Sequence, residues 1–142
     1  MQDRYLFRGK RTDNGEWVIG NRIDDGVTGQ VFIHAAGNSV NESDKVGEDG
    51  YLQFVAFEVD PSTICQCTGH DDKNANLIFE YDIVKFEEHI GVVMWDEESA
   101  SYCVKVPRYV FPYFFGTSCF ADKLEIVGNK FDNPELLEVQ NL

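Results

Sequence analysis

Residues 82–106 carry the pattern that most constrains the fold of this chain. Three runs rich in β-branched and aromatic residues, at 82–86, 90–96 and 102–106, are separated by polar links of three and five residues. Short polar links between such runs are typical of neighbouring antiparallel strands. The sequence therefore predicts a three-stranded antiparallel meander.

The middle run differs from its neighbours because it has apolar residues on both faces. In the first run Val84 and Phe86 share one face and Lys85 lies on the other, whereas the middle run places Val92 opposite Val93. A strand that is apolar on both faces is expected where both sides of a sheet are buried. We therefore predict a mainly β (β-rich α+β) fold of antiparallel strands, with a small SH3-like barrel module in the C-terminal half.

Local signals place further elements on both sides of this meander. Asn14-Gly15 lies between the apolar runs 5–7 and 17–19 and predicts a hairpin, because both residues tolerate positive φ. Asn133-Pro134-Glu135 predicts the start of a short C-terminal helix, with Asn133 as its cap. Other expected features are strands at 31–33, 51–59 and 64–68, a mobile loop at 37–50, a corner at 60–61 and a turn at 68–74.

The length of 142 residues suits one compact core, so we expect a single domain over residues 1–142. In this interpretation residues 1–59 form the N-terminal hairpin, strands and mobile loop. Residues 60–142 form the barrel-like module and the C-terminal helix.

The formal net charge of −13 opposes binding to phosphate backbones and to anionic lipid. Basic residues gather only near the start, as Arg4, Arg8, Lys10 and Arg11, and acidic neighbours dilute them. We therefore expect no membrane partner, and the charge disfavours nucleic acid as a partner. A nucleic-acid-binding small-barrel module remains an alternative, because small curled barrels often hold strands on an aromatic face.

The first residues contain no apolar run typical of a signal peptide, and no later stretch is apolar enough to span a bilayer. We accordingly expect a cytoplasmic protein. A cytosolic chain of this size needs no disulfides. We therefore expect free thiols at the four cysteines, Cys65, Cys67, Cys103 and Cys119.

Several blocks in a fixed order carry a family resemblance. They are Glu-Trp-Val-Ile-Gly-Asn at 16–21, Thr-Gly-His-Asp-Asp-Lys-Asn at 68–74 with Asp-Ile-Val at 82–84, and Ile-Val-Gly-Asn at 126–129 with Asn-Pro-Glu-Leu-Leu at 133–137. With these blocks the chain resembles the YopX family of phage and prophage proteins. The resemblance implies a β-rich fold with a barrel-like part, a phage or prophage gene and hence a bacterial host cytoplasm, and no established catalytic residues.

The chain departs from that family pattern at three positions. Ala75 and Tyr81 stand where we expect glycine, and His70 stands where we expect an apolar residue. An alanine in the left-handed region is strained. Ala75 therefore argues against a positive φ at this turn.

Metal binding is the first chemistry to weigh. Period two places Cys65 and Cys67 on one face of a strand, and His70 follows it, so these three residues are candidate zinc ligands. The alternative is that the thiols are small buried hydrophobes. Residues 72–76 imitate the start of a calcium loop, but the sixth and twelfth positions are Leu77 and Ile83, so a turn is the better interpretation. We expect no metal and no cofactor.

Catalytic chemistry has only weak candidates. The carboxylates in the two links could act as general acid and base, but adjacent exposed carboxylates are usually solvated charge. Cys103 or Cys119 could be a nucleophile with His34, His70 or His89, but no local signature accompanies either cysteine. We therefore expect no enzyme activity. The carboxylates concerned are Glu87, Glu88, Asp96, Glu97 and Glu98.

An aromatic run at 109–115 is the remaining feature. More aromatic side chains lie here than one side of a small core readily hides, so the run is either a plug that closes the core or a surface for a partner. The first hypothesis is a non-enzymatic protein-binding or assembly module with a host or phage protein as partner, or a homo-oligomer. The alternatives are the nucleic-acid module and a small metal protein or enzyme using Cys65, Cys67 and His70. The candidate surface residues are Tyr109, Phe111, Tyr113, Phe114 and Phe115.

Overall fold

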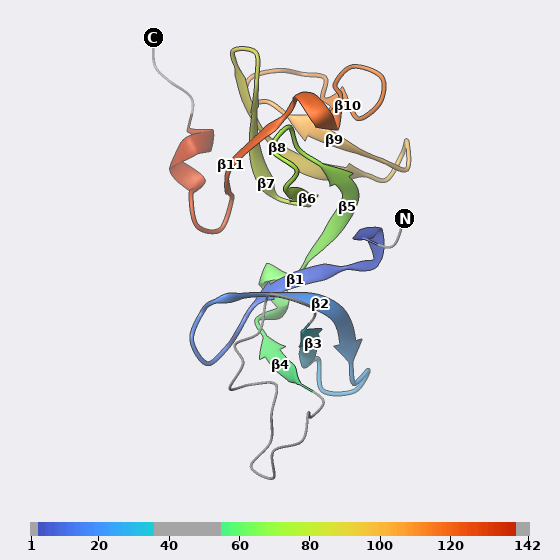
Figure 1. Cartoon of the computed structure of the whole chain (residues 1–142), viewed down its shortest axis with the longest axis vertical. Helices are drawn as coiled ribbons and strands as arrows, with labels where there is room; N and C mark the ends of the chain where they lie inside the picture. The colour runs from blue at the N-terminus through green and yellow to red at the C-terminus, as the bar shows by residue number, and fades with distance from the viewer. Residues whose placement is uncertain (1–2, 36–54, 139–142) are drawn as a thin grey trace. The chain divides into compact units, whose positions relative to one another are not determined.

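The computed structural model describes residues 3–35 and 55–138, and its chain divides into two compact units (Figure 1). One unit spans residues 4–66 and the other begins at residue 67. Both units are built from antiparallel strands. The predicted mobile loop at 37–50 lies outside the described residues.

The N-terminal unit contains four antiparallel strands in the order β4-β3-β2-β1. They are β1 (Phe7–Lys10), β2 (Trp17–Asp24), β3 (Val31–Ala35) and β4 (Ala56–Val59), and the first residues of β5 (Cys65–Asp71) pair with β1. The predicted hairpin is confirmed, with Lys10 opposite Trp17. Only Gly15 of the Asn-Gly pair has a positive φ, of 75°.

Alternation along these strands forms a small core on one face of the sheet. Its buried members are Val18, Val31, Ile33 and Val59, and Phe7, Ala35, Phe57 and Ile64 pack against it. Gly20 lies on the same face, where a Cβ atom would overlap the backbone carbonyl of His34. The close approach of β2 and β3 therefore requires glycine at this position.

The expected corner after β4 is a single 3-10 turn, η3 (Pro61–Thr63). The Asp60 carboxylate accepts a hydrogen bond from the backbone N–H of Ser62 at 3.0 Å and so caps the turn. Thr63 is buried, and its hydroxyl oxygen accepts a hydrogen bond from the backbone N–H of Lys10 at 2.9 Å. These bonds fix the turn to the end of β1.

The C-terminal unit contains a five-stranded antiparallel sheet in the order β10-β9-β8-β7-β11. The strands are β7 (Asp82–Phe86), β8 (His89–Asp96), β9 (Ser101–Lys105), β10 (Tyr113–Phe114) and β11 (Glu125–Asn129). The predicted meander is β7-β8-β9 and is confirmed. The remaining part of β5 pairs with β6 (Leu77–Phe79) in the same unit.

The core of this unit lies on the face that the alternation predicted. Val84 and Phe86 from β7, Val93 from β8 and Val104 from β9 are buried together with Ile78 from β6. The pKa of the Tyr102 phenol, beside this core, is raised to about 12, mainly by burial. Partly buried side chains that pack against the core include Tyr102, Tyr113, Phe115, Ala121 and Ile126.

The SH3-like barrel is not what the structure shows, because the sheet is open within the described residues. β10 and β11 form its two edges, and neither pairs with the other. The two apolar faces of β8 misled the prediction. Gly91 and Val93 are buried on one face and Trp95 lies on that same face yet is 39% exposed, while the opposite face is only partly buried. The strand lies in the middle of an open sheet.

The predicted C-terminal helix is also wrong, because the segment forms one 3-10 turn, η5 (Pro134–Leu137). Asn133 does not cap this turn through its side chain. Its Oδ1 atom instead accepts a hydrogen bond from the backbone N–H of Asn129 in β11, at 3.2 Å. Within residues 3–35 and 55–138 the helical segments are short 3-10 turns, and none has the length and hydrophobicity of a membrane-spanning helix.

Candidate functional site

The loop between β9 and β10 carries the most exposed apolar side chains of the C-terminal unit. Here we call residues 108–112 the aromatic loop. Tyr109 is 47% exposed, Val110 84% and Phe111 81%. Arg108 begins the loop with a φ of 73°, and the N–H of Tyr109 donates to the carbonyl of Val106 at 3.1 Å. The backbone turns sharply out of β9 and presents Val110 and Phe111 to solvent.

Four rings hold the two ends of this loop. The His89 ring centroid lies 5.2 Å from that of Tyr109, 5.4 Å from that of Tyr113 and 5.3 Å from that of Phe86. The ring centroids of Phe86 and Tyr113 are 5.1 Å apart, and the two rings meet edge to face. Edge-to-face ring pairs stabilise a fold by more than the burial of their apolar surface alone. We call Phe86, His89, Tyr109 and Tyr113 the ring cluster, and it anchors the loop while leaving its tip free.

The five aromatic residues of the predicted surface are therefore divided. Tyr109 and Phe111 are exposed, whereas Tyr113 and Phe115 pack against the core and Phe114 is partly buried in β10. Sequence reasoning missed the parts of Phe86 and His89 in this site, because Phe86 ends β7 and His89 begins β8, far from the aromatic run in the sequence. The only local signal was the aromatic run itself.

Two hollows lie beside the aromatic loop. The first has a volume of about 450 Å³ and is lined by residues 108–113 and Ser118. The second, of about 420 Å³, shares Tyr113 and Ser118 and extends to Phe86 and Phe120, with Glu87 and Lys123 also in its lining. Both hollows are open surface depressions in which aromatic side chains lie beside polar ones.

The residues considered for metal binding do not form a centre. Cys65 and Cys67 are fully buried, and His70 is exposed with its ring 5.8 Å from that of Phe115. Among residues 3–35 and 55–138, no three His, Cys, Asp or Glu side chains are grouped closely enough to hold a metal ion. All four cysteines are free thiols, as expected.

The calcium-like segment forms a turn. The Asp72 N–H donates to the Asn76 carbonyl at 2.8 Å, and the Ala75 N–H donates to the Asp72 carbonyl at 3.1 Å. One oxygen of the Asp72 carboxylate accepts from the backbone N–H groups of Asn74 and Asn76, each at 2.9 Å. Ala75 adopts a positive φ of 64° in this turn, contrary to the expectation from its Cβ atom.

The catalytic candidates have properties of structural or solvated groups. Burial raises the pKa of the Cys119 thiol to about 11, with the nearby Cys103 adding to the effect, and burial also raises the pKa of Cys103. A nucleophilic cysteine needs the opposite shift. Among the link carboxylates, Asp96 accepts a hydrogen bond from the N–H of Ser99 at 2.9 Å. The other four, Glu87, Glu88, Glu97 and Glu98, are exposed.

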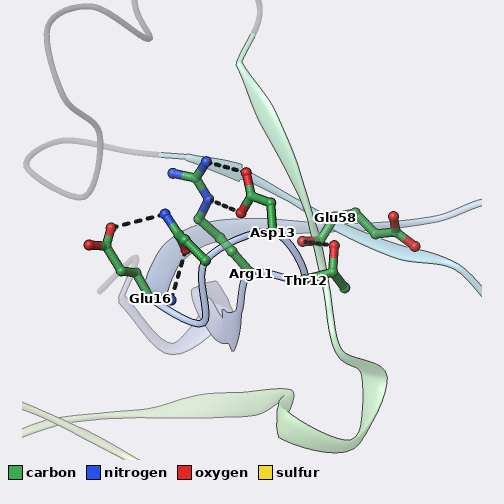
Figure 2. A network of polar contacts seen from close by, with 6 residues as sticks. Arg11, Thr12, Asp13, Glu16 and Glu58 are labelled. Carbon is green, nitrogen blue, oxygen red and sulfur yellow. Dashed lines mark hydrogen bonds and ion pairs between the residues drawn. The ribbon is translucent and has the colours of Figure 1, made fainter.

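The basic residues near the start of the chain are drawn into local contacts. Figure 2 shows the turn between β1 and β2, where the Arg11 guanidinium donates to both carboxylate oxygens of Asp13, at 2.9 and 2.7 Å. Arg11 also lies over the ring of Phe57, 3.8 Å from its centroid. In the same turn the Thr12 hydroxyl donates to the backbone carbonyl of Glu58 at 3.4 Å. An internal carboxylate thus offsets the charge of Arg11.

Comparison with known protein families gives a match that covers nearly the whole chain. The model of the family described as YopX protein matches residues 6–138. No curated protein matches the chain.

Proposed function

The chain belongs to the YopX protein family, and we propose that this member is a non-enzymatic protein-binding module. In this proposal a phage or prophage encodes it and it acts in the cytoplasm of the bacterial host. The observation that carries the proposal is the exposure of Val110 and Phe111, at 84% and 81%, on a loop that the ring cluster anchors. Adjacent exposed apolar side chains of this kind are typical of protein contact surfaces.

The charge of the C-terminal unit favours a basic partner. From residue 67 onward the chain has 6 basic against 14 acidic side chains. Complementary charge speeds the encounter of two proteins and selects among partners. The partner surface that fits this unit is therefore basic with an apolar centre, such as a host site that otherwise holds nucleic acid.

The chemical properties of the candidate nucleophiles support a non-enzymatic role. The buried Cys103 and Cys119 have raised pKa values, so neither is poised as a thiolate. The carboxylates Glu97 and Glu98 are exposed on a hairpin link, where carboxylates keep their ordinary solvation.

A photocross-linking experiment tests the proposal. Phe111 is replaced by the photoreactive p-benzoylphenylalanine, and the protein cross-linked in host lysate is identified and purified. Its affinity is then measured for the wild type, for a V110S/F111S double variant, and for V27S. Val27 is a matched control, because it is 89% exposed but lies in the N-terminal unit.

We expect V110S/F111S to weaken binding by about tenfold or more, as loss of a central contact usually does, and V27S to leave it unchanged. Equal affinity of all three proteins would remove the aromatic loop from the interface. Light scattering of the purified chain identifies a second copy as the partner if it finds an oligomer that V110S/F111S dissociates.

The nucleic-acid alternative rested on a barrel, and the sheet is open within the described residues. It stays a prediction, and a gel shift at low salt checks it. Retardation of single-stranded DNA or RNA at micromolar protein would favour it over the protein-binding proposal.

A further inference from the structure

A third hollow lies at the C-terminal side of the ring cluster. It has a volume of about 240 Å³ and is bounded by the start of β8, the residues after β9 and η5. Leu136 and Leu137 of η5 and the rings of His89 and Tyr109 are in its lining. Tyr109 also lines the hollow beside the aromatic loop, so the two hollows adjoin.

The charge in this hollow has one sign. Glu88 and Glu138 are in its lining, and no lysine or arginine is. The other two hollows differ, because Arg108 lines the first and Lys123 the second. Within residues 3–35 and 55–138, no basic side chain forms an ion pair with Glu88 or Glu138. Two carboxylates thus lie beside apolar and aromatic side chains, and no lysine or arginine of the described residues pairs with them.

This combination matches the chemistry of an arginine side chain. The aliphatic stem of arginine packs on apolar side chains while its guanidinium stays at a polar rim. The planar guanidinium also stacks on aromatic rings and donates to carboxylates in a fixed fork. Leucine side chains, two rings and two carboxylates supply all three kinds of contact.

Building on the protein-binding function proposed above, we propose that this third hollow receives an arginine side chain of the partner. The exposed Val110 and Phe111 then provide the apolar part of the interface, and the hollow adds specificity for a basic residue. The contact is expected to weaken as salt is added, because the two carboxylates are near solvent.

Nuclear magnetic resonance of the full ¹⁵N-labelled chain tests the hollow directly. The probe is N-acetyl-arginine amide, and the matched control probe is N-acetyl-citrulline amide, which has nearly the same shape and no charge. We expect arginine amide to shift the backbone signals of residues 88–90, 109 and 136–138. Citrulline amide should bind about two- to fivefold more weakly, the size expected when a near-surface ion pair is lost.

Charge-matched variants separate the hollow from general attraction to an acidic protein. E88Q/E138Q removes two carboxylates from the hollow, whereas E97Q/E98Q removes two exposed carboxylates from the β8–β9 link. We expect the first variant to lose about fivefold in affinity for arginine amide and the second to retain it. Equal loss in both variants, equal binding of the two probes, or no shift at 50 mM probe would each overturn the inference.

The outcome is distinguishable from failure of the proposed function. If a cross-linked partner needs Phe111 but binds E88Q/E138Q normally, the function stands and the inference is wrong. If arginine amide binds the hollow but no protein is cross-linked at position 111, the hollow stands and the proposed function is wrong. Both outcomes are measured on the full chain.

Discussion

The Asp72 carboxylate accepts a hydrogen bond from the backbone N–H of Ile126 at 3.0 Å, across 54 residues of sequence. Asp72 is only 4% exposed, and its other oxygen accepts from two N–H groups of its own turn. The carboxylate thus joins the turn at 72–76 to β11, the edge strand of the C-terminal sheet. Buried acceptors that bridge distant segments contribute strongly to stability, because removing them leaves buried N–H groups unpaired.

We predict that Asp72→Asn lowers the free energy of unfolding by about 1 to 3 kcal/mol. An asparagine oxygen can still accept from the turn, but its NH₂ group would face the N–H of Ile126, donor against donor. Asp122→Asn is the control, since Asp122 is exposed and the chemical change is the same. Urea unfolding at pH 7 measures both. A D72N variant as stable as D122N would show that the bond to β11 does not matter.

Acid titration gives a second measure of the same carboxylate. Burial by itself raises the pKa of Asp72, but hydrogen bonds from the N–H groups of Ile126, Asn76 and Asn74 outweigh it and lower the pKa. A lowered carboxyl pKa stabilises the fold above the unfolded value of about 3.9, and this contribution is lost as pH falls through the folded value. We expect the difference in the free energy of unfolding between the wild type and D72N to narrow below about pH 4. A constant deficit from pH 7 to pH 3 would contradict this cause.

Ala75 has a φ of 64°, and Ala100 a φ of 52°, in exposed turns of the C-terminal unit. An L-residue with a Cβ atom is strained in this region, whereas glycine is not. We predict that Ala75→Gly and Ala100→Gly each raise the free energy of unfolding by about 0.5 kcal/mol, after the greater freedom of glycine in the unfolded chain is subtracted. Ala121→Gly, at an ordinary φ, should lower it. Thermal unfolding of the three variants provides the comparison.

Sequence reasoning succeeded where pairing is local. The β7-β8-β9 meander has short links, so alternation identified its strands and the buried face of Val84 and Phe86. It missed β11, which pairs with the distant β7 and has a register irregularity between Ile126 and Gly128. It also missed β6 and β10, which are only 3 and 2 residues long.

The candidate site was predicted only in part for a similar reason. The aromatic run indicated a surface, but the separation of exposed Phe111 from inward Tyr113 depends on ring contacts with His89 and Phe86. Those two residues lie more than twenty positions earlier in the chain. The pattern of residues within the aromatic run therefore cannot predict its contacts with His89 and Phe86. The same holds for the third hollow, whose lining combines β8 with η5.

The four thiols should be unreactive in the folded protein. Cys65 and Cys67 are fully buried, Cys103 and Cys119 are 5% exposed, and the pKa of Cys119 is about 11. Because the thiolate is the reacting form, we predict labelling by Ellman's reagent at pH 7.5 to be roughly a hundredfold slower than that of glutathione. All four should react after unfolding in guanidinium. A V27C variant supplies one exposed thiol as a positive control, and rapid labelling of the wild type would contradict the burial.

Tyr102 should link stability to alkaline pH. Burial, the charge of Glu80 and the nearby Cys67 raise the pKa of its phenol to about 12, above the ordinary value of about 10. A raised phenol pKa favours the neutral form, so its contribution to stability is complete below pH 10 and is lost as pH rises toward 12. We predict that wild-type stability falls more steeply over this interval than that of Tyr102→Phe. The variant keeps the ring that packs 4.9 Å from Trp95. Tyr113→Phe is the control, because Tyr113 is also partly buried beside the core. Urea unfolding from pH 9 to pH 12 measures the stability of the three proteins. Parallel curves for the wild type and Y102F would show that Tyr102 does not cause this pH dependence.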